Sequence, residues 1–408
     1  MTALENYAKL AVEIGLNVQK SDGIIINANI EDKEFVRLVV DQCYKQGADF
    51  VEVNWMDQVL SRMKYENSPL EYFKEVPDWL FEKSKYFYDK RCKFLFIDSS
   101  DPNLLEGIDP EKIKESTLSY SKKMKPLQKY TMNDIVSWSI IATPELAWAK
   151  MVFPQAKSDE EAMELLLDAI LQVTRMKEDN PIQAWQDHIT NLQNKAKMLN
   201  DYAFESLHYC CENGTDLMVG LPEGHIWVSA TSTNEKGETF LPNIPTEEVF
   251  TMPHMDKVNG KLVSTMPLSY QGHIIDHFSF TFKDGAVVDF QAEKGEEVLR
   301  DMLNQDENAK KLGEVALVPY DSPISNANIL FYNTLFDENA SCHFAFGASY
   351  PTCLEGGSSL SEKELMERGG NDSLIHVDFM VGHEKLSIDG ITKEGEVIPV
   401  FRNGNFVI

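Results

Sequence analysis

The sequence lacks the long apolar runs of a membrane protein. No window approaches the ~18 to 20 unbroken apolar residues that cross a bilayer. Its start carries Glu5, Lys9, Glu13 and Lys20 at helical spacing, where a signal peptide would have an apolar core. We therefore expect a protein that has no membrane partner and works in the cytoplasm.

Cysteine is sparse, and no two cysteines have the Cys-x-x-Cys spacing of a zinc ribbon. A chain of 408 residues can bury a large core and needs no disulfides to fold, so we expect reduced thiols. A cysteine nucleophile has no support from neighbouring residues. The six cysteines are Cys43, Cys92, Cys210, Cys211, Cys342 and Cys353.

Positive charge is also in short supply. The 38 Lys and Arg residues stand against 65 Asp and Glu residues, which gives a net charge of −27. A surface this acidic repels the phosphates of nucleic acids, so nucleic acid is excluded as an expected partner. The same field attracts metal ions and protonated amines, although it equally serves solubility.

Motifs of several other functions are missing. Gly347-Ala348-Ser349 lacks the closing glycine of the Gly-x-Ser-x-Gly elbow of serine hydrolases. No Gly-x-Gly-x-x-Gly follows an expected strand in the first half, which argues against a dinucleotide-binding oxidoreductase. No Asp-x-Asp-x-Asp-Gly loop occurs, which weakens the case for a calcium-binding protein.

The first half contains short apolar runs that alternate with longer amphipathic ones, a pattern typical of a sheet covered by helices. Residues 158–211 predict two long helices that end near Gly214, and residues 217–220 predict a strand that returns to the sheet. A helix is expected over 32–47. The expected strands are 24–29, 50–55, 94–98 and 137–142. We predict an α/β N-terminal domain with a mostly parallel sheet.

After about residue 235, Gly, Pro and Asn punctuate short stretches in which apolar and polar residues alternate. The clearest is 277–282, followed by the Lys-Asp-Gly turn at 283–285. We therefore predict a β-rich α+β C-terminal domain that carries the metal site. The expected domains are 1–235 and 236–408, with a border that could lie about 20 residues either way.

The best single indication of a metal site lies in 374–380. Strand alternation places His376 and Asp378 on one face, ~6.5 Å apart, with apolar residues on the other face. The alternative is a structural His–Asp pair. Two further segments carry carboxylates: 243–251, where Thr246 with its acidic neighbours also resembles a helix N-cap, and Glu314, which precedes an apolar strand and could be a solvated strand end.

The segment 336–347 contains Glu338 and His343 among aromatic and small residues, although a single histidine there could simply belong to the core. Tyr350 by itself is an ordinary half-buried tyrosine. Together, carboxylates and imidazoles without thiolates favour Zn²⁺, Co²⁺, Mn²⁺ or Mg²⁺ used for hydrolysis. Six such ligands would hold two ions about 3.5–4 Å apart, with one carboxylate bridging them.

The same segments resemble the thermophilic-type metallo-aminopeptidases. The most specific are Pro-Thr-Glu-Glu-Val-Phe-Thr at 245–251 and Glu-Asn-Ala-Ser-Cys-His-Phe-Ala-Phe-Gly at 338–347. The resemblance extends nearly from end to end, through Gly-Leu-Pro-Glu-Gly-His at 220–225 to Phe-Arg-Asn-Gly at 401–404. It implies a metal-dependent aminopeptidase that acts on short peptides with a free N-terminus and forms a homodimer.

The resemblance also implies roles for individual residues. Tyr350 would face the reacting carbonyl, and Glu314 would bridge the two ions. In the mechanism that we expect from this site, Glu338 would carry the proton to the leaving amine. The implied ligands of the two divalent ions are Glu248, Glu314, Glu338, His343, His376 and Asp378. The alternative that remains is a non-enzymatic α/β protein that uses acidic loops to bind a metal or another cation.

Overall fold

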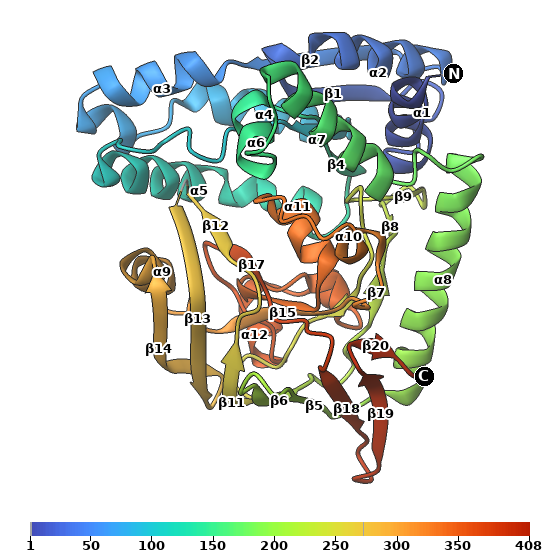
Figure 1. Cartoon of the computed structure of the whole chain (residues 1–408), viewed down its shortest axis with the longest axis vertical. Helices are drawn as coiled ribbons and strands as arrows, with labels where there is room; N and C mark the ends of the chain where they lie inside the picture. The colour runs from blue at the N-terminus through green and yellow to red at the C-terminus, as the bar shows by residue number, and fades with distance from the viewer. Residues whose placement is uncertain (1, 272) are drawn as a thin grey trace. The chain divides into compact units, whose positions relative to one another are not determined.

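The computed structural model describes residues 2–271 and 273–408, which form two compact units (Figure 1). The first unit runs to Asp187 and also contains Thr231–Pro245; the second contains His188–Ala230 and Thr246–Ile408. The sequence-based division placed a single border near residue 235. The chain instead passes between the units three times, after Asp187, Ala230 and Pro245.

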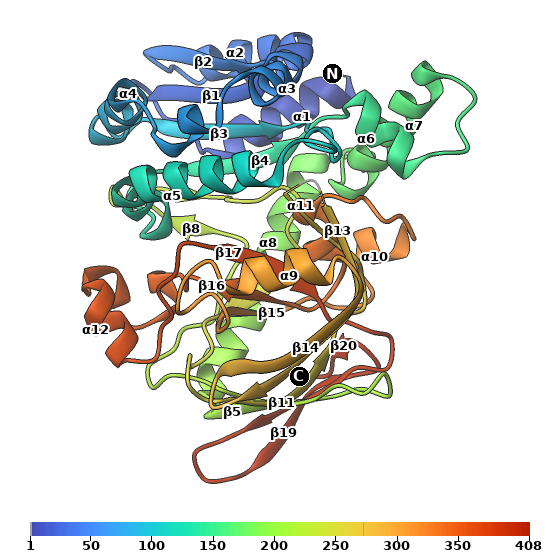
Figure 2. The ribbon, with the colours of Figure 1, turned by 90° about the vertical axis from the view of Figure 1, so that its left-hand side faces the viewer.

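The first unit is built on a four-stranded sheet with the order β2-β1-β3-β4, which Figure 2 shows stacked in that sequence. Each neighbouring pair is parallel, which confirms the predicted α/β domain. Its strands are β1 Gly23–Asn29, β2 Phe50–Met56, β3 Lys93–Asp98 and β4 Trp138–Ala142, with a small hairpin of β8 Ser232–Thr233 and β9 Thr239–Phe240.

Helices connect these strands because amphipathic runs separate the apolar ones. On one face of the sheet, Ile25 and Phe94 pack with Leu127 and Tyr130 of α5. The helices are α1 Ala3–Leu10, α2 Lys33–Lys45, α3 Gln58–Asn67, α4 Asp78–Asp89, α5 Pro110–Met132, α6 Leu146–Val152 and α7 Asp159–Val173, with a π-helix at Ala11–Gly15 and 3₁₀ turns at Ile30–Asp32 and Leu70–Lys74.

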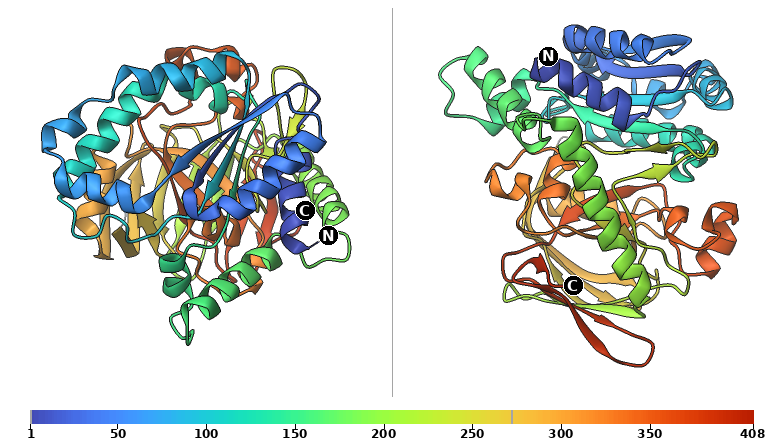
Figure 3. Two further views of the ribbon diagram at one scale, coloured as in Figure 1. Left: turned by 90° about the horizontal axis from the view of Figure 1, so that it is seen from above. Right: turned by 90° about the vertical axis from the view of Figure 1, so that its right-hand side faces the viewer.

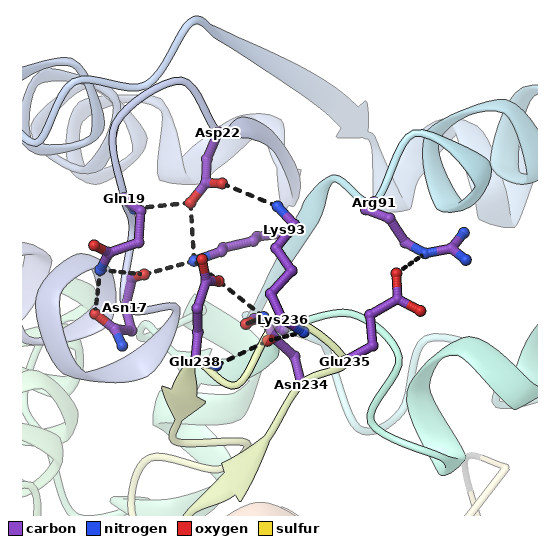
Figure 4. Close-up of polar contacts among 10 residues, drawn as sticks. Asn17, Gln19, Asp22, Arg91, Lys93, Asn234, Glu235, Lys236 and Glu238 are labelled. Atoms are coloured by element: carbon purple, nitrogen blue, oxygen red, sulfur yellow. Dashed lines mark hydrogen bonds and ion pairs between the residues drawn. The ribbon is translucent and has the colours of Figure 1, made fainter.

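A buried lysine ties the returning segment 231–245 to this unit (Figure 4). The Lys93 ammonium lies 2.8 Å from a carboxylate oxygen of Asp22 and 2.9 Å from one of Glu238. It also donates to the carbonyl of Asn17 at 2.5 Å. Each of its three N–H groups therefore has an acceptor, as burial of an ammonium requires.

The second unit consists mainly of two antiparallel sheets. The five-stranded sheet has the order β17-β16-β15-β10-β7, and the nine-stranded sheet runs β12-β13-β11-β6-β5-β18-β19-β20, with β14 paired to β13. Figure 1 shows β13 and β14 as a long hairpin, in the position the sequence predicted. The strands of the five-stranded sheet are β7 Val228–Ser229, β10 Val249–Thr251, β15 Leu312–Leu317, β16 His343–Gly347 and β17 His376–Met380.

The nine-stranded sheet contains β5 Ser206–Cys210, β6 Asp216–Gly220, β11 Val258–Val263, β12 Leu268–Tyr270, β13 His273–Lys283, β14 Ala286–Lys294, β18 Ser387–Ile391, β19 Val397–Arg402 and β20 Asn405–Phe406. Aromatic side chains join the two sheets. The Phe280 ring lies 4.9 Å from that of Phe346 on β16 and 5.2 Å from that of Phe379 on β17. Since side chains alternate along a strand, His343 and Asp378 point to the opposite face.

Helices of the second unit are short apart from α8. They are α9 Glu296–Leu303, α10 Pro323–Asn326, α11 Thr334–Asp337 and α12 Glu362–Glu367, with 3₁₀ turns at Glu338–Ala340, Pro351–Cys353 and Gly357–Ser359. Figure 3 shows α8 as a long helix; it spans Pro181–Tyr202 and so begins in the first unit and continues in the second. No helix within the described part of the chain is long and apolar enough to cross a membrane.

Two sequence-based predictions about this region were wrong. The second long helix ends at Tyr202, and residues 206–210 form β5, because Leu207 and Tyr209 alternate into the core. Residues 216–220 form β6, which pairs antiparallel with β5 and not with the parallel sheet of the first unit. The hairpin was missed because the residues before it favour a helix, and its strands are too short for their alternation to stand out.

Candidate metal centre

The strand β17 presents the two residues that alternation had placed together. The His376 Nε2 atom lies 3.6 Å from Asp378 Oδ1 and 3.3 Å from Oε2 of Glu314. Glu314 stands on β15, where it pairs with Ala345, and Ala345 pairs in turn with Asp378. Three adjacent strands therefore bring these donors to one face of the sheet.

The neighbouring strand β16 adds His343. Its Nε2 atom lies 3.0 Å from Glu248 Oε2 and 3.7 Å from Glu314 Oε1. The two oxygens of Glu314 thus face different histidines. The donors form two sets that share the carboxylate of Glu314: Glu248–Glu314–His343 and Glu314–His376–Asp378. Within each set, the three ligand atoms lie within 4.8 Å of one another.

Hydrogen bonds fix which nitrogen of each imidazole faces the carboxylates. His343 Nδ1 lies 2.9 Å from the carbonyl oxygen of Glu338, and His376 Nδ1 lies 2.8 Å from that of Ala348. A carbonyl only accepts, so each Nδ1 carries a hydrogen and donates it. A neutral imidazole then turns the lone pair of Nε2 toward carboxylate oxygens, an arrangement that a cation between them stabilises.

The electrostatics of the buried carboxyls show the same need for positive charge. Burial raises the pKa of Glu248, and the hydrogen bond with His343 opposes it only in part. Burial would also raise the pKa of Glu314, but hydrogen bonds from His343 and His376 lower it to about 2. Burial, with the nearby charges of Asp378 and Glu248, raises the pKa of Glu338 well above its ordinary value.

Both imidazoles respond in the complementary direction. Burial alone would lower the pKa of His343, but hydrogen bonds with Glu248 and Glu314 raise it well above its ordinary value. The pKa of His376 is raised in the same way against burial, mainly by Asp378. The carboxylates therefore favour a positive charge between them, which protons or metal ions can supply. Its oxygen and imidazole donors fit divalent ions of borderline or hard character.

Tyr350 lies at the edge of this group. Its ring is 5.1 Å from the His376 ring in an edge-on arrangement and 5.8 Å from the ring of Phe250. Burial and the surrounding carboxylates, led by Glu314, raise the pKa of Tyr350 well above its ordinary value. The phenol therefore keeps its proton and is able to donate a hydrogen bond.

The structure also separates Glu248 from its neighbour Glu247. While Glu248 faces His343, a carboxylate oxygen of Glu247 lies 3.4 Å from His188 Nε2. The backbone N–H of Glu247 donates to Asn339 Oδ1 at 2.8 Å, and Asn339 is fully buried. Asn339 thus joins the segment of Glu248 to that of Glu338.

Sequence reasoning gave no role to His188 or Asn339. Asn339 lies inside the motif at 338–347, and this position could have indicated a role in the site. His188 lies in a helix, and no sequence pattern marks it as part of the site. The seven residues named from the sequence do lie in one region of the second unit. They are Glu248, Glu314, Glu338, His343, Tyr350, His376 and Asp378.

The carboxylates and imidazoles without thiolates, gathered on a β-rich unit of a chain that also has an α/β unit, are the donor set of metal-dependent hydrolases. Residues 1–406 match the sequence profile of the thermophilic metalloproteases (M29). The chain belongs to this family, which confirms the resemblance noted in the sequence.

Relatives match the chain along its whole length. The aminopeptidase AmpS of Bacillus subtilis is 48% identical over 403 residues, covering 99% of this chain and 98% of that protein. Aminopeptidase T of Thermus thermophilus is 40% identical over 405 residues, with 99% and 98% covered. The solved structure of wild-type AmpT from Thermus thermophilus superposes with a TM-score of 0.92 at 39% identity, covering 100% of this chain and 99% of that one.

Proposed function

We propose that this protein is a metal-dependent aminopeptidase that removes N-terminal residues from short peptides in the cytoplasm. The observation that carries the proposal is the pair of donor sets that share the buried Glu314. It is supported by the full-length relatives, which are named aminopeptidases. Six cysteines that are all free support a reducing compartment.

The proposed centre would hold two divalent ions, Zn²⁺, Co²⁺, Mn²⁺ or Mg²⁺, and Glu314, which belongs to both donor sets, would serve both. Bound there, the ions would polarise the scissile carbonyl and lower the pKa of the attacking water. The two imidazoles are held in position by the carbonyl groups that accept from their Nδ1 atoms. The proposed ligands are Glu248, Glu314, Glu338, His343, His376 and Asp378.

Two residues of the chain would act on the substrate directly. Glu338, whose pKa is raised by burial, would accept a proton from the attacking water and pass it to the leaving amine. Tyr350, which keeps its proton, would donate a hydrogen bond to the oxygen that becomes negative in the transition state. One such donor is worth roughly 3 kcal/mol.

We also propose a homodimer. The edge strand β2 and helix α3 of the first unit expose several large apolar side chains, and α3 has none buried. Large apolar side chains exposed next to one another in sequence are candidates for burial against a second subunit. The exposed residues are Trp55, Met56, Val59, Leu60 and Met63. Light scattering should give the mass of a dimer, and Leu60→Asp should shift it toward that of one chain; a wild-type monomer would end this proposal.

The deciding experiment is hydrolysis of leucyl- and arginyl-p-nitroanilide before and after chelation. We expect cleavage of at least one substrate, loss of cleavage after chelation, and recovery when a divalent ion is returned. N-acetyl-leucyl-p-nitroanilide is the matched control, because an aminopeptidase requires a free amine. Cleavage that persists after complete metal removal, or no cleavage with any of the four ions, would contradict the proposal.

A further inference from the structure

A second cluster of possible metal ligands lies away from the candidate centre, on the nine-stranded sheet. Leu207 and Tyr209 of β5 are buried, so His208 and Cys210 between and beyond them point to the opposite, solvent face. Asp216 of β6 pairs in register with Cys210. One imidazole, one thiol and one carboxylate therefore meet on the surface of a single hairpin.

The distances within this cluster are short. His208 Nε2 lies 2.7 Å from Asp216 Oδ1, and Cys210 Sγ lies 3.8 Å from the same nitrogen. All three donor atoms lie within 4.8 Å of one another. From zinc–ligand bond lengths, donor atoms around a tetrahedral ion are separated by about 3.3–3.6 Å. The observed distances lie on either side of that range.

Small side-chain rotations would reconcile these distances, and the cluster allows them. The Asp216 side chain is 75% exposed, so no packing opposes its movement. The other acidic neighbour, Asp389, pairs in register with His208 but its carboxylate is engaged by Arg402 at 2.5 Å. Asp216 is therefore the carboxylate available to a cation next to His208.

We infer that His208, Cys210 and Asp216 form a binding site for a divalent ion of borderline softness, Zn²⁺ or Co²⁺, with water completing its coordination. Nitrogen, sulfur and oxygen donors in one place suit such ions, whereas Mg²⁺ and Ca²⁺ take oxygen ligands almost exclusively. The site is separate from the proposed catalytic centre, whose donors stand on or beside strands of the five-stranded sheet.

The plain alternative is a surface ion pair between His208 and Asp216, in which Cys210 has no part. Such exposed pairs contribute little to stability. A reactive thiolate is the other alternative, but burial and the carboxylates of Asp216 and Asp389 raise the pKa of Cys210. Without a cation the thiol keeps its proton, which disfavours a nucleophilic role.

The test uses cobalt, because a bond from Co²⁺ to a thiolate produces a charge-transfer band in the near ultraviolet. None of the proposed catalytic ligands is a cysteine, so Co²⁺ in that centre does not give the band. Full-length protein is stripped with a chelator and titrated with Co²⁺. We expect the band in the wild type, its loss in Cys210→Ser, and its retention in Cys211→Ser, the matched control next in the sequence.

A wild-type protein that binds Co²⁺ without the band would overturn the site, as would a band that survives in Cys210→Ser or disappears in Cys211→Ser. A second measurement follows Zn²⁺ affinity by competition with a chromophoric chelator. Cys210→Ser should remove the Zn²⁺ binding at this site. His208→Gln and Asp216→Asn should each weaken that Zn²⁺ binding by at least ~10-fold. Unchanged affinity in either variant would refute the three-ligand site.

This result is independent of the proposed function. Cys210→Ser should hydrolyse leucyl-p-nitroanilide at the wild-type rate once the catalytic ions are restored, which also shows that the variant folds. An inactive wild type with the cobalt band would separate the two proposals.

Discussion

Replacement of the buried lysine in the first unit should destabilise it strongly. Lys93 is 1% exposed, and its ammonium pairs with the carboxylates of both Asp22 and Glu238, while the partly exposed Lys236 lies 3.6 Å from the other oxygen of Asp22 (Figure 4). In Lys93→Met, a side chain of similar length fills the space, but the two carboxylates lose their common partner. The substitution therefore changes the electrostatic interaction while it leaves the packing nearly unchanged.

The magnitude follows from the environment of the two carboxylates. Breaking a buried ion pair by removing one partner costs about 3–5 kcal/mol. Asp22 is buried but keeps Lys236 at 3.6 Å, and the Glu238 side chain is 20% exposed and regains some hydration. Both facts place the expected cost near the lower limit. A loss of about 3 kcal/mol in a unit of this size lowers Tm by about 6–12 °C.

Thermal unfolding followed by circular dichroism measures this shift. Arg37→Met is the matched control, since Arg37 and Glu34 form an ion pair at 2.7 Å with side chains 70% and 74% exposed. That variant should change stability by at most ~0.5 kcal/mol. Adding Asp22→Asn to Lys93→Met should recover part of the loss. If Lys93→Met melted as Arg37→Met does, the reasoning about the buried charge would be wrong.

Three further outcomes are expected. Tyr350→Phe should lower kcat ~100-fold with unchanged metal content, because it removes one oxyanion donor; an equal loss of metal by elemental analysis would show that its role is misassigned. His343→Ala should lose both bound metal and activity, because it deletes a ligand; a fully active variant would contradict the centre. Burial raises the pKa of Asp134 to about 7, although a hydrogen bond from Ser232 acts in the other direction. The unfolded chain loses this proton near pH ~4, so the free energy of unfolding should fall between pH ~4 and 7 and stay constant above that. Asp134→Asn should therefore match the wild type in denaturant midpoint near pH 4 and exceed it at pH 8; a lower midpoint at pH 8 would refute this.

The parts of the fold that the sequence predicted are those specified by local pattern. The strands of the parallel sheet have apolar runs bounded by amphipathic helices, and β17 showed its two faces by alternation alone. The strand β5 was missed because only Leu207 and Tyr209 mark its buried face, next to a long helix-favouring stretch. The exchange of segments between units depends on contacts distant in sequence, which no local pattern records.

The candidate site shows the same limit. His343 and Glu314 are far apart in sequence, and each had an ordinary structural explanation by itself. Their convergence was expected from the combined donor set and from the resemblance to a family, and the structure brings His343 Nε2 within 3.7 Å of Glu314 Oε1. A buried amide such as Asn339 follows no periodicity in the sequence. The hydrogen bond by which it links two ligand segments therefore could not be predicted from the sequence.

The triple passage of the chain between its units has a practical consequence for dissection of the protein. A polypeptide that ends at Asp187 lacks Thr231–Pro245, the segment that supplies Glu238 to Lys93. The other polypeptide, from His188 onward, contains this segment without the unit against which it packs. Neither half should fold when expressed by itself. Co-expressed halves should restore activity by fragment complementation, and chimaeras between relatives must exchange both stretches of a unit together.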